Sequence, residues 1–323
     1  MAAAIARLGF DPTTASEDTV IHHDLPWRPN VADDVAAYNA WLMAVVSPTR
    51  KVIRNGVALP IVHQPFRESP SMRYLGVRRP RTDAVNQFIT NNAWSGYEGN
   101  GYAGTFGVVN GAWNVPGLQY PKVAGDIYYS AAWVGIDGGK SAPPYPPEQN
   151  NVFQSGTEMD ETYAGNGTLT ASYYIWREYT PDPIVFEMNT NAFDYVGCQV
   201  FKYITNNRAA GEYWCKDYQT GQVAEYAQWV DSRMVNSTAE WIVERPFVNG
   251  GWAPLSNYSS ISFGSAWIYT TTKVFFPVFS IYPHWSLYQI EMLSDSTHQE
   301  LSGAYSLNRS DGQGIGFEWF NSF

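Results

Sequence analysis

Two glutamates in the stretch TAEWIVERPF, residues 238–247, have the type and spacing that acid–base chemistry can use. If this stretch forms a β-strand, its side chains alternate between two faces. Glu240, Ile242 and Glu244 then share one face, whereas Trp241 and Val243 lie on the other. Because the second face alone would supply a core, the two acids on the first face are candidates for chemistry.

The same alternation brings polar and aromatic side chains together on three more predicted strands. The sets that share a face are Trp133, Gly135 and Asp137; Tyr174, Trp176 and Glu178; and Val152 and Gln154. Any one set fits a solvated sheet face, which is common. Together, tryptophans beside Gln and Glu with small residues between them favour a wall that binds a substrate.

Other catalytic chemistry has little support in the sequence. His22 and His23 are adjacent and point apart on a strand, and the other three histidines are isolated, so the pattern predicts no metal site. No Gly-x-Ser-x-Gly elbow is present, and the Gly-rich stretches lack the Lys-Ser/Thr of a phosphate loop. We therefore expect neither a metal nor a cofactor.

The elements that must position these residues are mostly β-strands. Aromatic residues make up 16% of the 323 residues, and this favours strands. Short strand patterns separated by Gly, Asn, Asp and Pro clusters indicate an all-β sandwich of two sheets or a jelly roll. The patterns fall at residues 102–110, 126–137, 150–156, 169–179, 197–204, 212–218, 223–230, 239–245, 260–270 and 286–292.

The first 84 residues differ in texture from the rest. Apolar spacing over 30–47 predicts a helix, and residues 66–83 hold five arginines in a proline-broken linker. We therefore divide the chain into an N-terminal extension, 1–84, and a β-sandwich domain, 85–323.

The net charge of −10 argues against nucleic acid or an anionic membrane as a partner. No stretch is long enough to span a bilayer, and the apolar start is too short for a signal peptide, so we expect a soluble chain. Cys198 and Cys215 flank a predicted loop between two strands. They could form a cross-strand disulfide or remain two buried thiols.

Six ordered blocks resemble the glutamic peptidases called eqolisins, of the scytalidoglutamic peptidase type. The blocks are SAAWVGIDG, VFQSGTEMD, YYIWREYTPDP, CKDYQTGQ, TAEWIVERPF and APLSNYSSISF. The resemblance covers residues 88–265 closely. It implies a concanavalin-like sandwich of two antiparallel sheets, with a catalytic glutamine and glutamate on a concave face.

Residue by residue, the resemblance places the catalytic pair at Gln154 and Glu244. Trp133 and Trp176 match the family's cleft tryptophans, and Asp137 and Glu178 match acidic neighbours of the pair. One departure is the run REYTP, which puts Arg177 and Thr180 where aromatic residues are usual and leaves the shape of the subsites open.

The implied activity is an endopeptidase that acts on proteins or peptides. Glu244 would activate water as general base, and the Gln154 amide would stabilise the oxyanion. Because an ordinary glutamate has a pKa of about 4.3, we expect activity under acidic conditions. We also expect a secreted monomer, in which residues 1–84 act as an inhibitory propeptide or, alternatively, as a permanent accessory layer.

Two other functions fit parts of the pattern. A laminarinase-type glycoside hydrolase shares the sandwich but needs carboxyl groups roughly 5 to 9 Å apart, whereas Glu240 and Glu244 on a regular strand would be roughly 13 Å apart. A lectin-like module could use the tryptophans to stack sugars, but this leaves Gln154 and Glu244 unexplained.

Overall fold

The computed structural model describes the chain in segments and contains no helix in them. The described residues are 11, 13–16, 50–54, 85–119, 126–139, 151–163, 169–205, 208–230, 234–248, 251–279, 285–294, 297–307 and 312–322. The helix predicted at 30–47 lies outside these residues.

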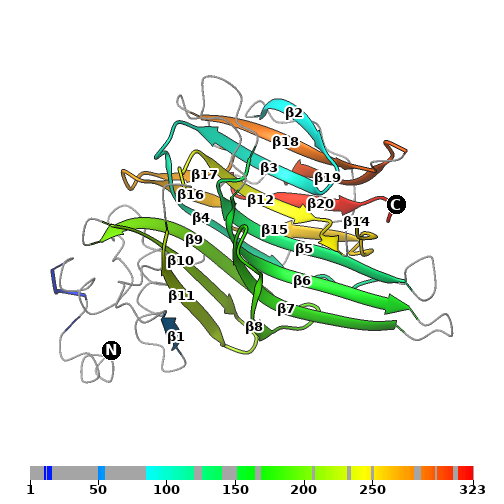
Figure 1. Ribbon diagram of the computed structural model, residues 1–323, viewed down its shortest axis with the longest axis horizontal. Helices are drawn as coiled ribbons and strands as arrows, with labels where there is room; N and C mark the ends of the chain where they lie inside the picture. The colour runs from blue at the N-terminus through cyan, green and yellow to red at the C-terminus, as the bar shows by residue number, and fades with distance from the viewer. Residues whose placement is uncertain are drawn as a thin grey trace.

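Eighteen of the described strands form one hydrogen-bonded network that folds into two layers (Figure 1). In the first layer the strand order is β8 (Val185–Asn189), β7 (Leu169–Tyr179), β6 (Phe153–Tyr163), β5 (Ile127–Ile136), β12 (Thr238–Glu244), β3 (Trp94–Gly101), β18 (Trp285–Leu293) and β2 (Val85–Asn91). We call this layer the first sheet. Its pairings are antiparallel except that of β2 with β18.

The second sheet contains the remaining strands of the network. Its order begins β1 (Arg50–Arg54), β11 (Val223–Trp229), β10 (Arg208–Asp217), β9 (Tyr195–Thr205) and β4 (Phe106–Asn114). It continues through β15 (Ser260–Phe263), β16 (Trp267–Thr270), β17 (Phe275–Pro277), β20 (Ile315–Trp319) and β19 (Glu300–Ser306). Pairing of β18 with β19 joins the two layers, and a separate hairpin of β13 (Phe247–Val248) and β14 (Gly251–Trp252) follows β12.

The core lies between the two sheets and is built from one face of each strand. Trp241 of β12 is fully buried, and its indole N–H donates to the carbonyl of Asn110 on β4. Trp113 of β4 is also fully buried and donates to Thr157 Oγ1 of β6. These bonds give the buried indole nitrogens partners and fix the facing of the sheets. The all-β, antiparallel prediction is therefore confirmed.

Cys198 and Cys215 are bonded to each other. They lie directly opposite on β9 and β10, and both are buried in the core. Of the two alternatives left open by the sequence, the cross-strand disulfide is the one in the structure.

Loss of this disulfide should destabilise the fold. The bond closes a loop of 17 residues, for which the loss of chain entropy in the unfolded state predicts about 2–4 kcal/mol. We expect a Cys198→Ser/Cys215→Ser variant to show this drop in the free energy of unfolding, measured by urea titration. An unchanged midpoint and slope would show that the bond contributes nothing.

Candidate active site

Strand β12 turns Glu240, Ile242 and Glu244 away from the core, as the alternation predicted. Ala239, Trp241 and Val243 pack in the main core, whereas Ile242 packs on the opposite face of the first sheet with Trp133 and Trp176. The apolar face of β12 thus anchors the strand, and the other face is left to carry its two acids.

Strand register gathers further polar groups on this face. Gln154 of β6 lies opposite Glu178 of β7 on one side and Gly135 of β5 on the other. Gly135 in turn lies opposite Glu240. A Cβ atom at Gly135 would come within 3.3 Å of Glu240 Oε2, so the missing side chain leaves room in this row.

A second row lies four residues along the strands. Glu158 of β6 is opposite Ala131 of β5, and Ala131 is opposite Glu244. We call the face that carries both rows the acidic face; its defining residues are Gln154, Glu158, Glu178, Glu240 and Glu244.

Glu244 is held by indole groups. Trp133 Nε1 donates to Glu244 Oε2 at 2.7 Å, and Trp94 packs edge-on against Trp133 with ring centroids 5.1 Å apart. Burial raises the pKa of Glu244 to about 7, against the hydrogen bonds from Trp133 and Trp94, and the negative charge of Glu178 adds to the rise. Glu244 is therefore a carboxyl group that titrates close to neutrality.

Gln154 is held by Glu178. Gln154 Nε2 donates to Glu178 Oε2 at 2.6 Å, and Gln154 Oε1 is buried with no hydrogen-bond partner among the described residues. Burial raises the pKa of Glu178, while hydrogen bonds from Gln154 and Thr180 lower it. Glu178 therefore interacts with both predicted catalytic residues, although strand register puts Gln154 in the first row and Glu244 in the second.

Two more carboxyl groups belong to the site but were missed by sequence reasoning. Glu158 and Asp160 follow Gln154 on the same face of β6, and Tyr174 Oη donates to Asp160 Oδ2 at 2.7 Å. Burial raises the pKa of Glu158 well above its usual range, and the charges of Asp160, Glu244 and Glu178 raise it further. In QSGTEMD, Gln154, Glu158 and Asp160 stand at positions i, i+4 and i+6, and this alternation could have revealed both residues.

The other predicted site residues divide into two groups. Trp176 is 2% exposed, packs with Trp133 on the acidic face, and its indole N–H has no hydrogen-bond partner among the described residues. Asp137 instead lies at the end of β5 with φ of 66° and accepts backbone N–H bonds from Asn236 and Ser237, both at 2.9 Å. Asp137 therefore fixes the entry to β12, whereas Trp176 lines the acidic face.

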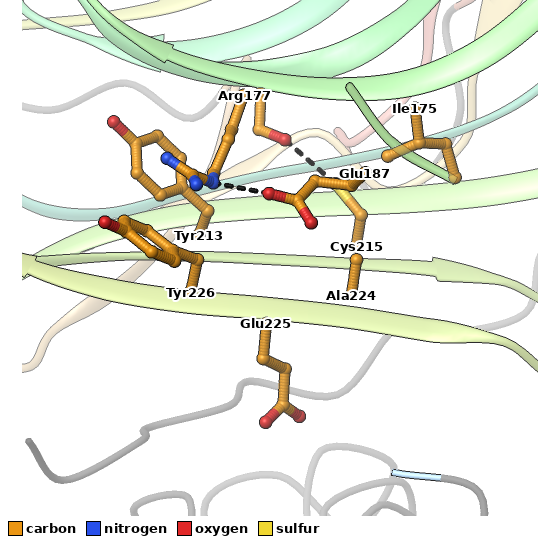
Figure 2. A pocket seen from close by; sticks show the side chains of 9 residues that line it. Ile175, Arg177, Glu187, Tyr213, Cys215, Ala224, Glu225 and Tyr226 are labelled. Carbon is orange, nitrogen blue, oxygen red and sulfur yellow. Dashed lines mark hydrogen bonds and ion pairs between the residues drawn. The ribbon is translucent and has the colours of Figure 1, made fainter. Parts of the chain in front are cut away.

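Arg177 lies on the other face of β7 and does not contribute to the acidic face. Its Nε atom pairs with Glu187 Oε1 at 2.6 Å, and its guanidinium carbon lies 3.3 Å from the centroid of the Tyr226 ring (Figure 2). With Tyr213 these groups line a small cavity of about 10 Å³, which has room for at most one water molecule. The sequence departure at Arg177 therefore changes the interior near the β8 edge, and Arg177 does not shape the surface around Gln154.

The described segments also show what kinds of site are absent from them. Within these segments, no three His, Cys, Asp or Glu side chains are grouped so as to hold a metal ion. No helix in these segments has the length and apolar character needed to cross a membrane.

The spacing of Glu240 and Glu244 argues against the glycosidase pair. Between these two residues β12 pairs with β3 and β5 without a register shift. On a regular strand four residues span roughly 13 Å, so the bulge that a pair of glycosidase carboxyl groups would require is missing.

Comparisons with known proteins agree with this fold. The model of the Peptidase A4 family matches residues 92–278. The structure is similar to scytalido-glutamic peptidase crystallised with a peptide-based transition state analog, at 18% identity and a TM-score of 0.51, over 71% of this chain and 98% of that one. It is also similar to SCP-B, a member of the eqolisin family of peptidases in complex with the tripeptide Ala-Ile-His, at 18% identity, a TM-score of 0.50 and the same coverage. The search of curated proteins found no match.

The buried acids predict a fold that is more stable in acid. Glu240 is fully buried opposite Glu98, and burial together with the charge of Glu98 raises its pKa well above the usual range. A carboxyl group whose pKa is raised by folding stabilises the native state at low pH, and this stability is lost as the pH rises through the folded-state pKa. We therefore expect the melting temperature to fall between pH 4.5 and pH 7.5.

The variant Glu240→Gln isolates this effect. At pH 7.5 the variant with the neutral amide should melt at a higher temperature than the wild type, in which Glu240 must either retain its proton or carry a buried charge. At pH 4.5 the two melting temperatures should agree within about a degree or two. Melting measured by circular dichroism at both pH values gives the comparison. An equal loss of stability at the two pH values would show that Glu240 is not a destabilising acid.

Proposed function

Because the chain belongs to the peptidase A4 family, we propose that it is a glutamic endopeptidase with Gln154 and Glu244 as its catalytic pair. The observation that carries the assignment is that Glu178 hydrogen-bonds Gln154 while its charge raises the pKa of Glu244. Glu178 therefore interacts with both residues, by a hydrogen bond with Gln154 and by its charge with Glu244, on the face opposite the core.

Glu244 is the base in this proposal. The indole N–H groups of Trp133 and Trp94 hydrogen-bond its carboxyl group, which is otherwise poorly solvated, and they stabilise the ionised form. Once ionised, Glu244 takes a proton from water as the water attacks the peptide carbonyl carbon. The resulting carboxylic acid then gives the proton to the leaving amine. No covalent intermediate with the protein forms.

Gln154 is the oxyanion donor. One N–H of its amide is bound by Glu178, which orients the group, and the second N–H is left for the developing negative charge on the carbonyl oxygen. Glu178 is therefore a positioning residue. Trp133 and Trp176 supply an apolar surface beside the pair, which suits bulky side chains of a peptide substrate.

Burial changes the pH range that the sequence alone suggested. With a pKa of about 7, Glu244 is ionised only in about one molecule in a thousand at pH 4. Burial and the charges of Asp160, Glu244 and Glu178 raise the pKa of Glu158 well above its usual range and so favour its neutral form. We therefore propose weakly acidic rather than strongly acidic conditions, roughly pH 5 to 7, as the working range.

The disulfide bears on where the enzyme works. A disulfide buried in a sandwich persists in an oxidising compartment, and this supports secretion.

Substitution of the pair tests the assignment. We expect Glu244→Gln and Gln154→Ala to lower kcat about 10²- to 10⁴-fold on a denatured protein substrate, because each removes one transition-state contribution. Glu240→Gln is the matched control, since it makes the same chemical change on the same face of the same strand. Cleavage by Glu244→Gln at the wild-type rate would refute the base, and equal loss in the Glu240→Gln control would point to a general effect of charge.

The pH profile tests the role of the neighbouring acid. We expect a bell-shaped dependence of kcat/KM whose lower limb reports Glu244 and whose upper limb reports ionisation of Glu158. Glu158→Gln should remove the negative charge that builds up beside Glu244 and extend activity toward higher pH. An upper limb that stays in place in this variant would show that another group controls it.

A further inference from the structure

A row of apolar residues crosses the acidic face between its two polar rows. Its members, each opposite the next in strand register, are Ile242, Trp133, Gly156, Trp176 and Phe186. We call this the apolar row. Gln154 precedes its member on β6 by two residues, and Glu244 follows its member on β12 by two residues. A peptide whose cleaved bond lies between Gln154 and Glu244 would therefore lie over the apolar row.

Phe186 of β8 is the exposed end of the apolar row. Its side chain is 57% exposed, whereas Trp133 and Trp176 are at most 2% exposed. The Phe186 ring packs edge-on with the Tyr174 ring, with centroids 4.4 Å apart. Because Tyr174 Oη donates to Asp160 Oδ2, the ring on which Phe186 packs is itself held in place. Phe186 is therefore ordered before a ligand arrives, which lowers the entropy cost of binding to it.

A β-bulge turns Phe186 toward the acidic face. In the pairing of β7 with β8, the register shifts between Ile175 and Trp176, and Glu187 is the extra residue. In a regular pairing, Glu187 would lie opposite Trp176 on the acidic face, and Phe186 would lie opposite Arg177 on the other face. The bulge therefore exchanges a charged residue for an aromatic one at the end of the apolar row.

The ion pair of Glu187 with Arg177 stabilises this arrangement. Figure 2 shows Glu187 turned toward Arg177, and the two side chains are only 7% and 12% exposed. Moving Glu187 to the acidic face would leave the Arg177 guanidinium buried without this partner, which is costly. Single exposed apolar residues are common on protein surfaces. Phe186 differs from them because a bulge and a largely buried ion pair fix the face on which it lies, and bulges often re-aim a side chain beside an active site.

We propose that Phe186 binds an apolar side chain of the peptide substrate, about three residues from the cleaved bond. The inference rests on the proposed function, because it takes Gln154 of β6 to mark the position of that bond. Strands β6 and β8 are two strand spacings apart, which is about 10 Å, and an extended peptide advances about 3.3 Å per residue. A peptide that follows the apolar row therefore brings the third residue from the cleaved bond over Phe186.

Two peptides that differ only in Phe or Ser at this third position test the proposal, and the position is varied on each side of the cleaved bond in turn. We expect wild-type kcat/KM to be about tenfold higher for the Phe peptide on one side. Phe186→Ser should lose this preference by slowing only the Phe peptide, and Phe186→Leu should retain most of it. No preference in the wild type, or an undiminished preference in Phe186→Ser, would overturn the proposal.

Phe193→Ser is the matched control. Phe193 is 73% exposed and lies in the connection between β8 and β9, where its backbone N–H donates to the carbonyl of Val115. We expect this variant to keep the wild-type preference for the Phe peptide. An equal loss of preference in Phe193→Ser would assign the effect to removal of any exposed phenylalanine and would overturn the specific role of Phe186.

Binding of the same peptides separates this inference from the proposed catalytic pair. In the Glu244→Gln variant, calorimetric titration should show about tenfold tighter binding of the Phe peptide, and addition of Phe186→Ser should remove the difference. If the peptides bind with this preference but the wild type does not cleave them, the proposed function fails and the inference stands. If the wild type cleaves them and Phe186→Ser keeps the preference, the inference fails and the proposed function stands.

Discussion

The two-residue period of a β-strand is the constraint on which this structure depends. On β5, β6, β7 and β12, one set of alternate side chains is buried between the sheets, and this fixes both register and direction. The other set must then lie on the opposite face of the first sheet. Hydrogen bonds such as that from the Trp241 indole to the Asn110 carbonyl hold the buried set in place. The positions of Gln154 and Glu244 are therefore set by the packing of their neighbours in the strand.

This arrangement places several carboxyl groups on the acidic face, and ionising all of them would be unfavourable for the folded protein. Glu158, Glu178 and Glu244 act on one another electrostatically, and Glu240 is buried opposite Glu98. Each raised pKa measures the cost of ionising a carboxyl group that has lost its water. The members differ in the hydrogen bonds that oppose this cost. Because Glu244 accepts from two indoles, it is better able to hold a charge than Glu158, whose neighbours are themselves acids.

Much of this face could be predicted from the sequence because alternation is a local property. The positions of Glu240, Ile242 and Glu244 on one face needed only the strand pattern of residues 238–244. Asp137 does not follow the alternation rule, because its positive φ ends the strand one residue early. Its carboxylate instead turns toward the backbone of residues 236 and 237. Alternation also puts Glu158 on the face of Gln154, but it does not show that Glu158 and Trp94 lie near Glu244, because this depends on register between strands far apart in the chain.

The buried acids of the two sheets differ in what surrounds them. Glu158 and Glu244 lie beside other acids, where protonation is the cheapest way to avoid repulsion, and in the proposed mechanism this makes their titration available for catalysis. Glu212 and Glu225 are buried on the outer face of the second sheet, away from the proposed pair. Burial alone therefore does not mark a carboxyl group as catalytic. What distinguishes Glu244 is the pair of indole N–H groups that hydrogen-bond it and stabilise its ionised form.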